Sequence, residues 1–125
     1  MGLGLFSATQ IGVEEVERDF QPVLVPGERV LAAFRTTRDL VFLTNARICL
    51  VNKQGLTGRK LDVESIPYRA VTRWSVETAG TFDLDADLTL HVSGTPQPIV
   101  IKIGRGSDTA GIQRILAQGV LGGAR

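Results

Sequence analysis

The pattern of apolar and polar positions begins with the period of a helix. Between residues 10 and 24, apolar side chains recur every three or four positions, and acidic residues dominate the positions between them. This spacing predicts an amphipathic helix with one apolar face. Ser7 and Gln10 have the spacing of a capping box, and Pro26 followed by Gly27 predicts that the helix has ended. The expected apolar stripe is Val13, Val16, Phe20 and either Val23 or Leu24.

After Gly27 the period becomes two, which is typical of strands. The first connections, Thr37-Arg38 and Asn45-Ala46, are short enough for antiparallel hairpins. No helical insert lies between the alternating runs, so a doubly wound α/β fold is excluded. The pattern indicates a mainly β (α+β) protein built as an antiparallel sandwich or small barrel. We expect strands near residues 28–36, 39–44, 46–53, 59–64, 71–77, 83–92 and 98–103.

A second helical pattern follows the last strand. Residues 104–108 end the sheet, and Ser107 or Asp108 is the expected N-cap. The apolar stripe of this helix is Ile112, Ile115 and Leu116. No internal repeat is found, so we expect one domain over residues 1–125. It divides into an N-terminal helical segment (1–27), a β-barrel (28–104) and a C-terminal helix (105–121).

Two of the expected strands are apolar on both faces. The runs are Leu40–Leu43 and Ile48–Val51. A small free-standing barrel would show polar residues at alternate positions, facing water. Something must therefore cover the outer face of these strands, either the N-terminal helix or another protomer.

Composition removes several classes of protein. The chain has 125 residues, 14 Lys plus Arg, 13 Asp plus Glu, one His and one Cys. These counts allow neither an internal disulfide nor a closed zinc site, and we expect no metal and no cofactor. A formal charge of +1 argues against a nucleic-acid binder. With no signal peptide and no long apolar window, we expect a cytoplasmic protein.

Candidate catalytic groups are scarce. His91 lies on the polar face of an expected strand, with no nucleophile near it in the sequence. Cys49 lies between Ile48 and Leu50, where a thiol packs as a small apolar group. We therefore predict no catalytic residues and no enzymatic activity.

Charged residues divide between two parts of the chain. Asp83, Asp85 and Asp87 are spaced to share one face of a strand but lack the glycine and glutamate of a calcium loop. The expected interaction surface comprises Glu77, Thr78, Asp83, Asp85 and Asp87. Basic residues gather in the first hairpins, among them Arg35, Arg38, Arg47, Lys53, Arg59 and Lys60. The candidates for contact with an anionic headgroup are Arg35, Arg38 and Arg47.

Three segments resemble the bacterial pleckstrin-homology-like (PH-like) domain family of small single-domain proteins. They are TNARICLVNKQGLTG at 44–58, SIPY at 65–68 and SVETAGTFDLDADL at 75–88. The resemblance implies a seven-stranded, bent antiparallel sheet or partly open barrel with a C-terminal helix plugging one end, here with an extra N-terminal helix. It also implies a closed cyclic homo-oligomer, with a pentamer as the expected size, and a polar surface where strands of adjacent protomers meet.

These features lead to one hypothesis and one alternative. The hypothesis is a non-enzymatic interaction or scaffold module that forms a ring and presents a polar strand surface to a protein partner. The alternative is a membrane-surface domain that binds anionic lipid headgroups through basic residues of the first hairpins.

Overall fold

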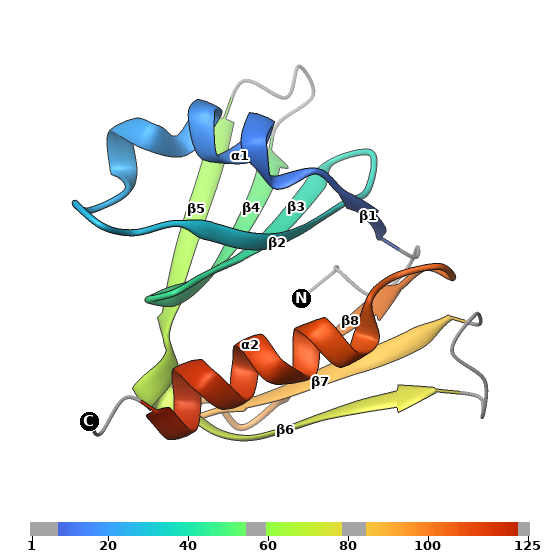
Figure 1. The fold of residues 1–125 in the computed structure, drawn as a ribbon. Coiled ribbons are helices and arrows are strands. Elements are labelled where there is room, and N and C mark those ends of the chain that lie inside the picture. The colour runs from blue at the N-terminus through green and yellow to red at the C-terminus, as the bar shows by residue number, and fades with distance from the viewer. Residues whose placement is uncertain (1–7, 55–59, 79–84, 123–125) are drawn as a thin grey trace.

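The residues that the structure describes form two antiparallel sheets and two helices (Figure 1). The computed structural model describes residues 8–54, 60–78 and 85–122. The first sheet has the strand order β1-β2-β3-β4-β5, and the second has the order β6-β7-β8. The strands are β1 (Thr9–Ile11), β2 (Val30–Arg35), β3 (Asp39–Thr44), β4 (Arg47–Gln54), β5 (Lys60–Pro67), β6 (Val71–Thr78), β7 (Ala86–Val92) and β8 (Ile99–Ile103). The helices are α1 (Val13–Phe20) and α2 (Thr109–Leu121), and short 3-10 turns are η2 (Gln21–Val23) and η3 (Tyr68–Ala70).

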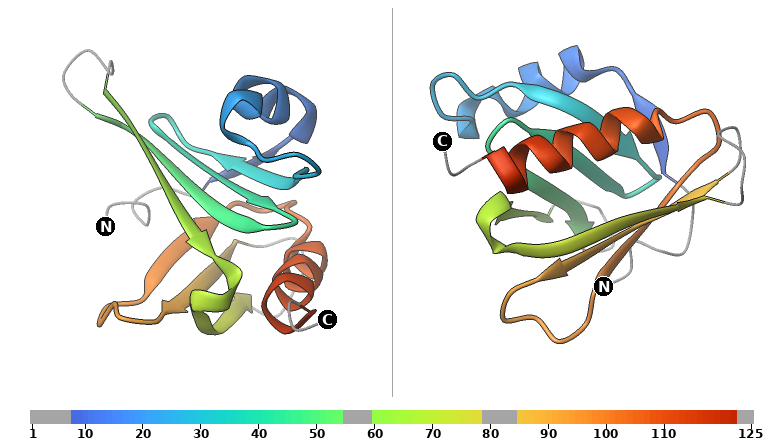
Figure 2. Two further views of the ribbon diagram at one scale, coloured as in Figure 1. Left: turned by 90° about the vertical axis from the view of Figure 1, so that its left-hand side faces the viewer. Right: turned by 60° about the horizontal axis from the view of Figure 1, so that its bottom comes forward.

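The two sheets join at one corner and stay apart at the other. Ala8 makes a parallel bridge to Ile103, where its N–H donates to the Lys102 carbonyl at 2.7 Å and its carbonyl accepts from the Gly104 N–H at 2.9 Å. At the opposite corner the chain passes from β5 through η3 into β6, and within the described residues β5 pairs only with β4 and β6 only with β7. The barrel is therefore partly open (Figure 2), as expected for a PH-like fold.

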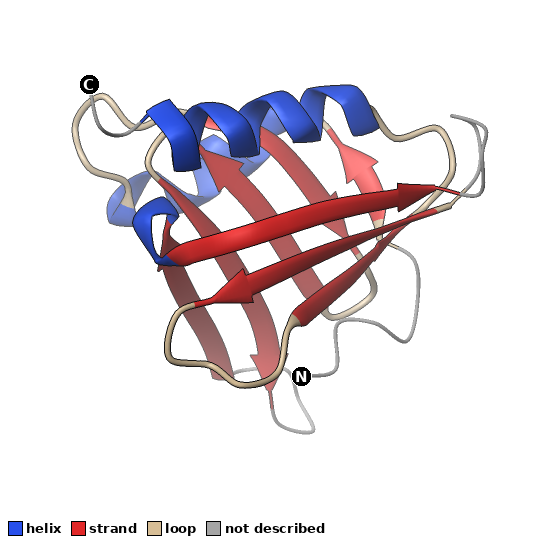
Figure 3. Ribbon diagram, turned by 90° about the horizontal axis from the view of Figure 1, so that it is seen from below, coloured by secondary structure: helices blue, strands red, loops and turns tan. Residues whose placement is uncertain are grey.

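The main core fills the space between the sheets. It contains side chains that are buried almost completely, among them Phe34, Leu43, Ile48, Leu88, Leu90, Ile101 and Ile103. The helix α2 lies across the gap between the sheets (Figure 3) and adds Ile112 and Leu116 to this core. The Asp108 carboxylate accepts a hydrogen bond from the Gly111 N–H at 2.9 Å, so the predicted cap is confirmed.

The helix α1 covers the outer face of the first sheet. Val16 is buried there against Ala33, Phe42 and Cys49, in a second apolar cluster separate from the main core. The Phe20 and Phe42 rings pack with their centroids 4.9 Å apart. Of the two covers considered for the doubly apolar strands, the helix of the same chain is the one found.

The start of the chain differs from its prediction. A helix was expected from residue 10, but Thr9–Ile11 is a strand whose Gln10 lies opposite Phe34 of β2. The Gln10 side chain accepts from the Asp108 N–H at 2.7 Å and so takes no part in a capping box; Ser7 lies outside the described residues. The pairing of this strand with β2, and of the preceding Ala8 with Ile103, outweighs the helical pattern here, because a sheet edge formed by residues far away in the sequence satisfies the backbone groups of this segment.

The expected strands agree with the observed ones in order and type. All but the second, which matches β3, differ at their ends by one to three residues: β2 begins at Val30, β4 extends to Gln54, β5 extends to Pro67, and β7 begins at Ala86. Asp83, expected in the sixth strand, lies outside the described residues. With β1 added, the described chain has eight strands where seven were expected.

Candidate interaction surfaces

The outer face of the second sheet is polar. Glu77 of β6 lies opposite Asp87 of β7, and Asp87 lies opposite Lys102 of β8. Lys102 Nζ is 3.3 Å from Asp87 Oδ1, and both side chains are about half-buried. We call the row Glu77, Asp87 and Lys102 the polar row. The same face continues with Arg73 opposite His91.

The residues expected to form one interaction surface are only partly brought together. Glu77 and Asp87 share the polar row, and Asp85 is exposed just before β7 begins. Thr78 is adjacent to Glu77 in a strand and so faces the other side of the sheet, where it lines a small hollow beside the start of α2. Lys102 was missed, although the alternation of β8 places it on the polar side.

The strand β5 forms an exposed edge. Its residues 60–65 are all exposed, on both faces of the strand. Leu61 retains 54% and Val63 38% of full exposure. A long edge strand with exposed apolar side chains is a natural site for pairing with another strand.

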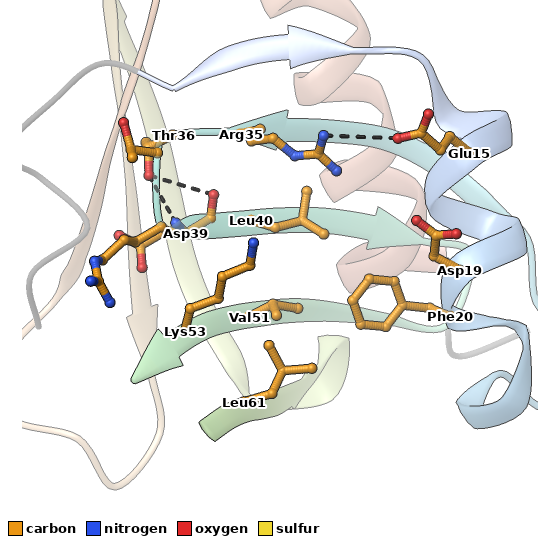
Figure 4. A pocket seen from close by; sticks show the side chains of 12 residues that line it. Glu15, Asp19, Phe20, Arg35, Thr36, Asp39, Leu40, Val51, Lys53 and Leu61 are labelled. Carbon is orange, nitrogen blue, oxygen red and sulfur yellow. Dashed lines mark hydrogen bonds and ion pairs between the residues drawn. The ribbon is translucent and has the colours of Figure 1, made fainter. Parts of the chain in front are cut away.

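A hollow of about 500 Å³ lies between α1, the β2–β3 turn and β5. Figure 4 shows its floor, formed by Leu40 and Val51 with Phe20 and Leu61 beside them. We call this feature the outer hollow. Register explains the floor, because Leu40 and Val51 are directly opposite each other on the outer face of the sheet.

The rim of the outer hollow carries charges of both signs. Arg35, Arg38 and Lys53 come from the strands and their turn, and Glu15 and Asp19 come from α1. Arg35 Nη1 lies 3.9 Å from Glu15 Oε1. Burial raises the pKa of Asp39, also at the rim, and the Arg38 charge opposes that rise only in part.

Arg47 lies at the other end of β4 and does not join Arg35 and Arg38. Its guanidinium donates to the Glu28 carboxylate from Nε at 2.8 Å and from Nη2 at 2.9 Å. Nη2 also donates to the Val23 carbonyl at 2.7 Å, and Nη1 donates to Ser65 Oγ at 3.0 Å. Arg47 is therefore engaged inside the protomer by a bidentate ion pair.

Glu28, which nothing in the sequence singled out, is the centre of this cluster. Its side chain is only 1% exposed, and it accepts from Thr44 Oγ1 at 2.7 Å and from the Val25 N–H at 3.0 Å. Burial alone would raise the pKa of Glu28, but the hydrogen bonds from Arg47, Thr44 and Val25 outweigh it and hold that pKa below its usual value. We call Glu28, Thr44 and Arg47 the buried ion cluster.

The scarce nucleophilic groups lie apart from one another. Cys49 is buried under α1, and burial raises the pKa of its thiol despite the opposing effect of the Arg47 charge. His91 lies on the outer face of the second sheet. Among the described residues no group of three or more His, Cys, Asp or Glu side chains is arranged to hold a metal ion. No helix in that part of the chain is long and apolar enough to span a membrane.

A partly open barrel of two antiparallel sheets with a C-terminal helix across the gap defines a PH-like protein. The chain belongs to the bacterial PH domain family, whose model matches residues 2–120. The resemblance inferred from the sequence is therefore confirmed. Domains with this fold generally serve as interaction modules and are generally not enzymes.

Relatives and solved structures agree with this assignment. The chain is 42% identical over 114 residues to the uncharacterized protein YjqA of Bacillus subtilis (strain 168), covering 90% of this chain and 91% of the relative. It is similar to a DUF1696 family protein with a pleckstrin-homology domain from Shewanella loihica, with a TM-score of 0.80, 39% identity and coverage of 91% and 97% of the two chains. A pleckstrin homology domain from Shewanella amazonensis gives a TM-score of 0.69, 41% identity and coverage of 88% and 99%.

Proposed function

We propose that this protein is a non-enzymatic scaffold that assembles into a ring of identical protomers and presents its polar row to a protein partner. The observation that carries the proposal is the exposed β5 edge, with Leu61 and Val63 open to solvent. Burying such an edge in a neighbour would satisfy backbone groups and remove apolar surface from water.

The proposed contact joins the β5 edge of one protomer to the β6 edge of the next. These two edges belong to different sheets, and each pairs on one side only within the described residues. A contact between two different surfaces is heterologous, and a heterologous contact generates a closed ring when its rotation permits. A β5–β5 contact would instead stop at a dimer. The family resemblance favours five protomers.

Light scattering coupled to size exclusion tests the assembly. Five copies of the 13.5 kDa chain would give about 68 kDa. Val63→Lys should shift the protein toward the monomer, because an edge lysine opposes strand addition. Val100→Lys is the matched control, since Val100 lies on β8 and is equally exposed. A wild-type monomer at micromolar concentration, or equal effects of the two substitutions, would contradict the proposed contact.

The polar row is the proposed site for a protein partner. Glu77 and Asp87 lie side by side across two strands, so a partner with basic side chains would complement them. A pull-down with the assembled wild-type protein should retain a partner that the variant Glu77→Lys/Asp87→Lys loses while keeping its own oligomeric mass. Retention by both proteins would exclude this face.

The alternative of binding to anionic headgroups is less favoured. Arg35 and Arg38 flank the outer hollow, but Arg47 is held by Glu28, and acidic residues share the rim. Sedimentation with anionic vesicles would favour this alternative if binding were salt-sensitive and lost in Arg35→Gln/Arg38→Gln.

A further inference from the structure

We propose that the outer hollow binds a small zwitterion, in which an anionic group and an ammonium group stand on either side of an apolar segment. The inference does not depend on ring formation, because one protomer supplies all the residues that line the hollow; of these, Leu61 also belongs to the exposed β5 edge. Three properties of the hollow support it: its size, its apolar floor and the way its charges pair.

The hollow has the size and floor of a small-molecule site. Its volume of about 500 Å³ lies within the roughly 300–1,000 Å³ typical of such sites. Leu40 and Val51 form a floor that is buried from below, while Leu61 beside them remains 54% exposed. An apolar segment placed across this floor would remove the exposed area of Leu61 from water.

When the charged residues on the rim are matched with their neighbours, one cation and one anion have no partner within the described residues. Arg35 faces Glu15, and Arg38 is electrostatically coupled to Asp39. Within the described part of the chain, neither Lys53 nor Asp19 makes a side-chain hydrogen bond or ion pair. Lys53 and Asp19 lie on opposite sides of Leu40 (Figure 4).

This arrangement discriminates between ligand types. A simple anion would be attracted to Lys53 but would leave the Asp19 carboxylate facing its apolar part. A simple cation would be attracted to Asp19 but would leave the Lys53 ammonium group facing its apolar part. A zwitterion compensates both charges, and partial exclusion of water by the apolar segment strengthens each contact.

Both charged residues stand on well-anchored elements. The Lys53 N–H donates to the Arg38 carbonyl at 3.2 Å, which ties β4 to the β2–β3 turn. The helix that carries Asp19 is fixed by Glu17, whose carboxylate accepts from the Val30 N–H at 2.8 Å and from Arg29 Nε at 3.0 Å. Because the separation of the two charges is set by the fold, the site should prefer one ligand length.

A series of ω-amino carboxylates of about four to ten carbons provides the probes, matched by the alkyl carboxylate and alkyl ammonium ion of each length. Binding to the full chain is followed by NMR chemical shifts and calorimetry. We expect one chain length to bind best, and its two singly charged analogues to bind at least about tenfold more weakly. The proposal is overturned if no probe binds, or if the alkyl carboxylate binds as tightly as the zwitterion of equal length.

Two variants separate the roles of the charges. In Lys53→Gln the zwitterion should bind no better than the alkyl ammonium ion, and in Asp19→Asn no better than the alkyl carboxylate. Arg114→Gln, which removes an exposed cation from α2, should leave the affinities unchanged. Thermal melts show whether each variant is folded, and an unchanged preference for the zwitterion in folded Lys53→Gln or Asp19→Asn also overturns the proposal.

Discussion

The buried ion cluster and the rim of the outer hollow lie toward opposite ends of β4, and they use the same kinds of side chain differently. Arg47 donates to both oxygens of a carboxylate that is almost fully buried. Arg35 only approaches Glu15, at 3.9 Å, and Lys53 lies over an apolar floor. The segment between α1 and β2 causes the difference, because it brings Glu28 beneath Arg47 and no comparable acid beneath Lys53. Whether a basic residue on a strand forms an internal ion pair or remains available to bind a ligand therefore depends on which residue a distant loop places beside it.

Removing Arg47 should have the largest effect of the changes considered. Arg47→Met leaves the Glu28 carboxylate buried without its ion-pair partner, and we expect a loss of about 3 kcal/mol in the free energy of unfolding. Urea denaturation at neutral pH measures it. A loss below about 1 kcal/mol would mean that water replaces the guanidinium and that the two regions differ less than their geometry indicates.

Glu28→Gln should have the next largest effect, about 2 kcal/mol at pH 7, because it keeps the shape of the side chain but removes its charge. The folded pKa of Glu28 is lowered, so its contribution to stability is fully present above its unfolded pKa and is lost as the pH falls through the folded pKa. Urea midpoints from pH 7 downward should therefore converge for wild type and Glu28→Gln in acid. A constant difference down to pH 2 would contradict the role of this charge.

Tyr68→Phe tests a hydrogen bond to the backbone of Thr44, a member of the buried ion cluster. The Tyr68 hydroxyl donates to the Thr44 carbonyl at 2.6 Å, in a buried position. Its loss should cost about 1 kcal/mol, since it leaves one buried acceptor with a missing donor. Thermal unfolding measures the loss, and a stability equal to wild type would show that the carbonyl finds another donor.

Arg35→Gln should have the smallest effect on stability, below about 0.5 kcal/mol, because its ion pair with Glu15 is long and exposed. The same urea titration at low and high salt measures it. If Arg35→Gln lowered the free energy of unfolding as much as Arg47→Met, the proposed difference between the exposed rim and the buried ion cluster would be wrong.

The periodicity of the chain predicted the strands well because each strand carries its own signal. Along each strand, residues that face the main core, such as Phe34, Val41 and Leu50, alternate with residues that face the other side of the sheet. Each hairpin pairs two strands that are adjacent in the sequence. The Asp108 cap could also be predicted, because its hydrogen bond joins residues only three positions apart. The strand at Thr9–Ile11 was missed, because its three residues pair with β2, more than twenty residues away, and have no alternation of their own.

The candidate sites were predicted less completely, for a related reason. Glu77 and Asp87 could be placed on one face from alternation alone, and Lys102 could have been added in the same way. Arg47 could not be separated from Arg35, since all that distinguishes them is a contact across nineteen residues to Glu28. Lys53 belonged to the basic group, but its opposition to Asp19 across Leu40 depends on how α1 lies on the sheet.

The sequence by itself determined the mainly β class, the order of the strands, the capped C-terminal helix and the presence of two apolar faces on the central strands. These follow from side-chain periodicity and turn chemistry, which act between near neighbours. Only the tertiary structure decided that α1 covers its own sheet, that Arg47 pairs with the buried Glu28, and that Lys53 and Asp19 lie on opposite sides of an apolar floor. Such contacts join residues far apart in the chain, and their strength depends on burial, which exists only once both partners have been brought together.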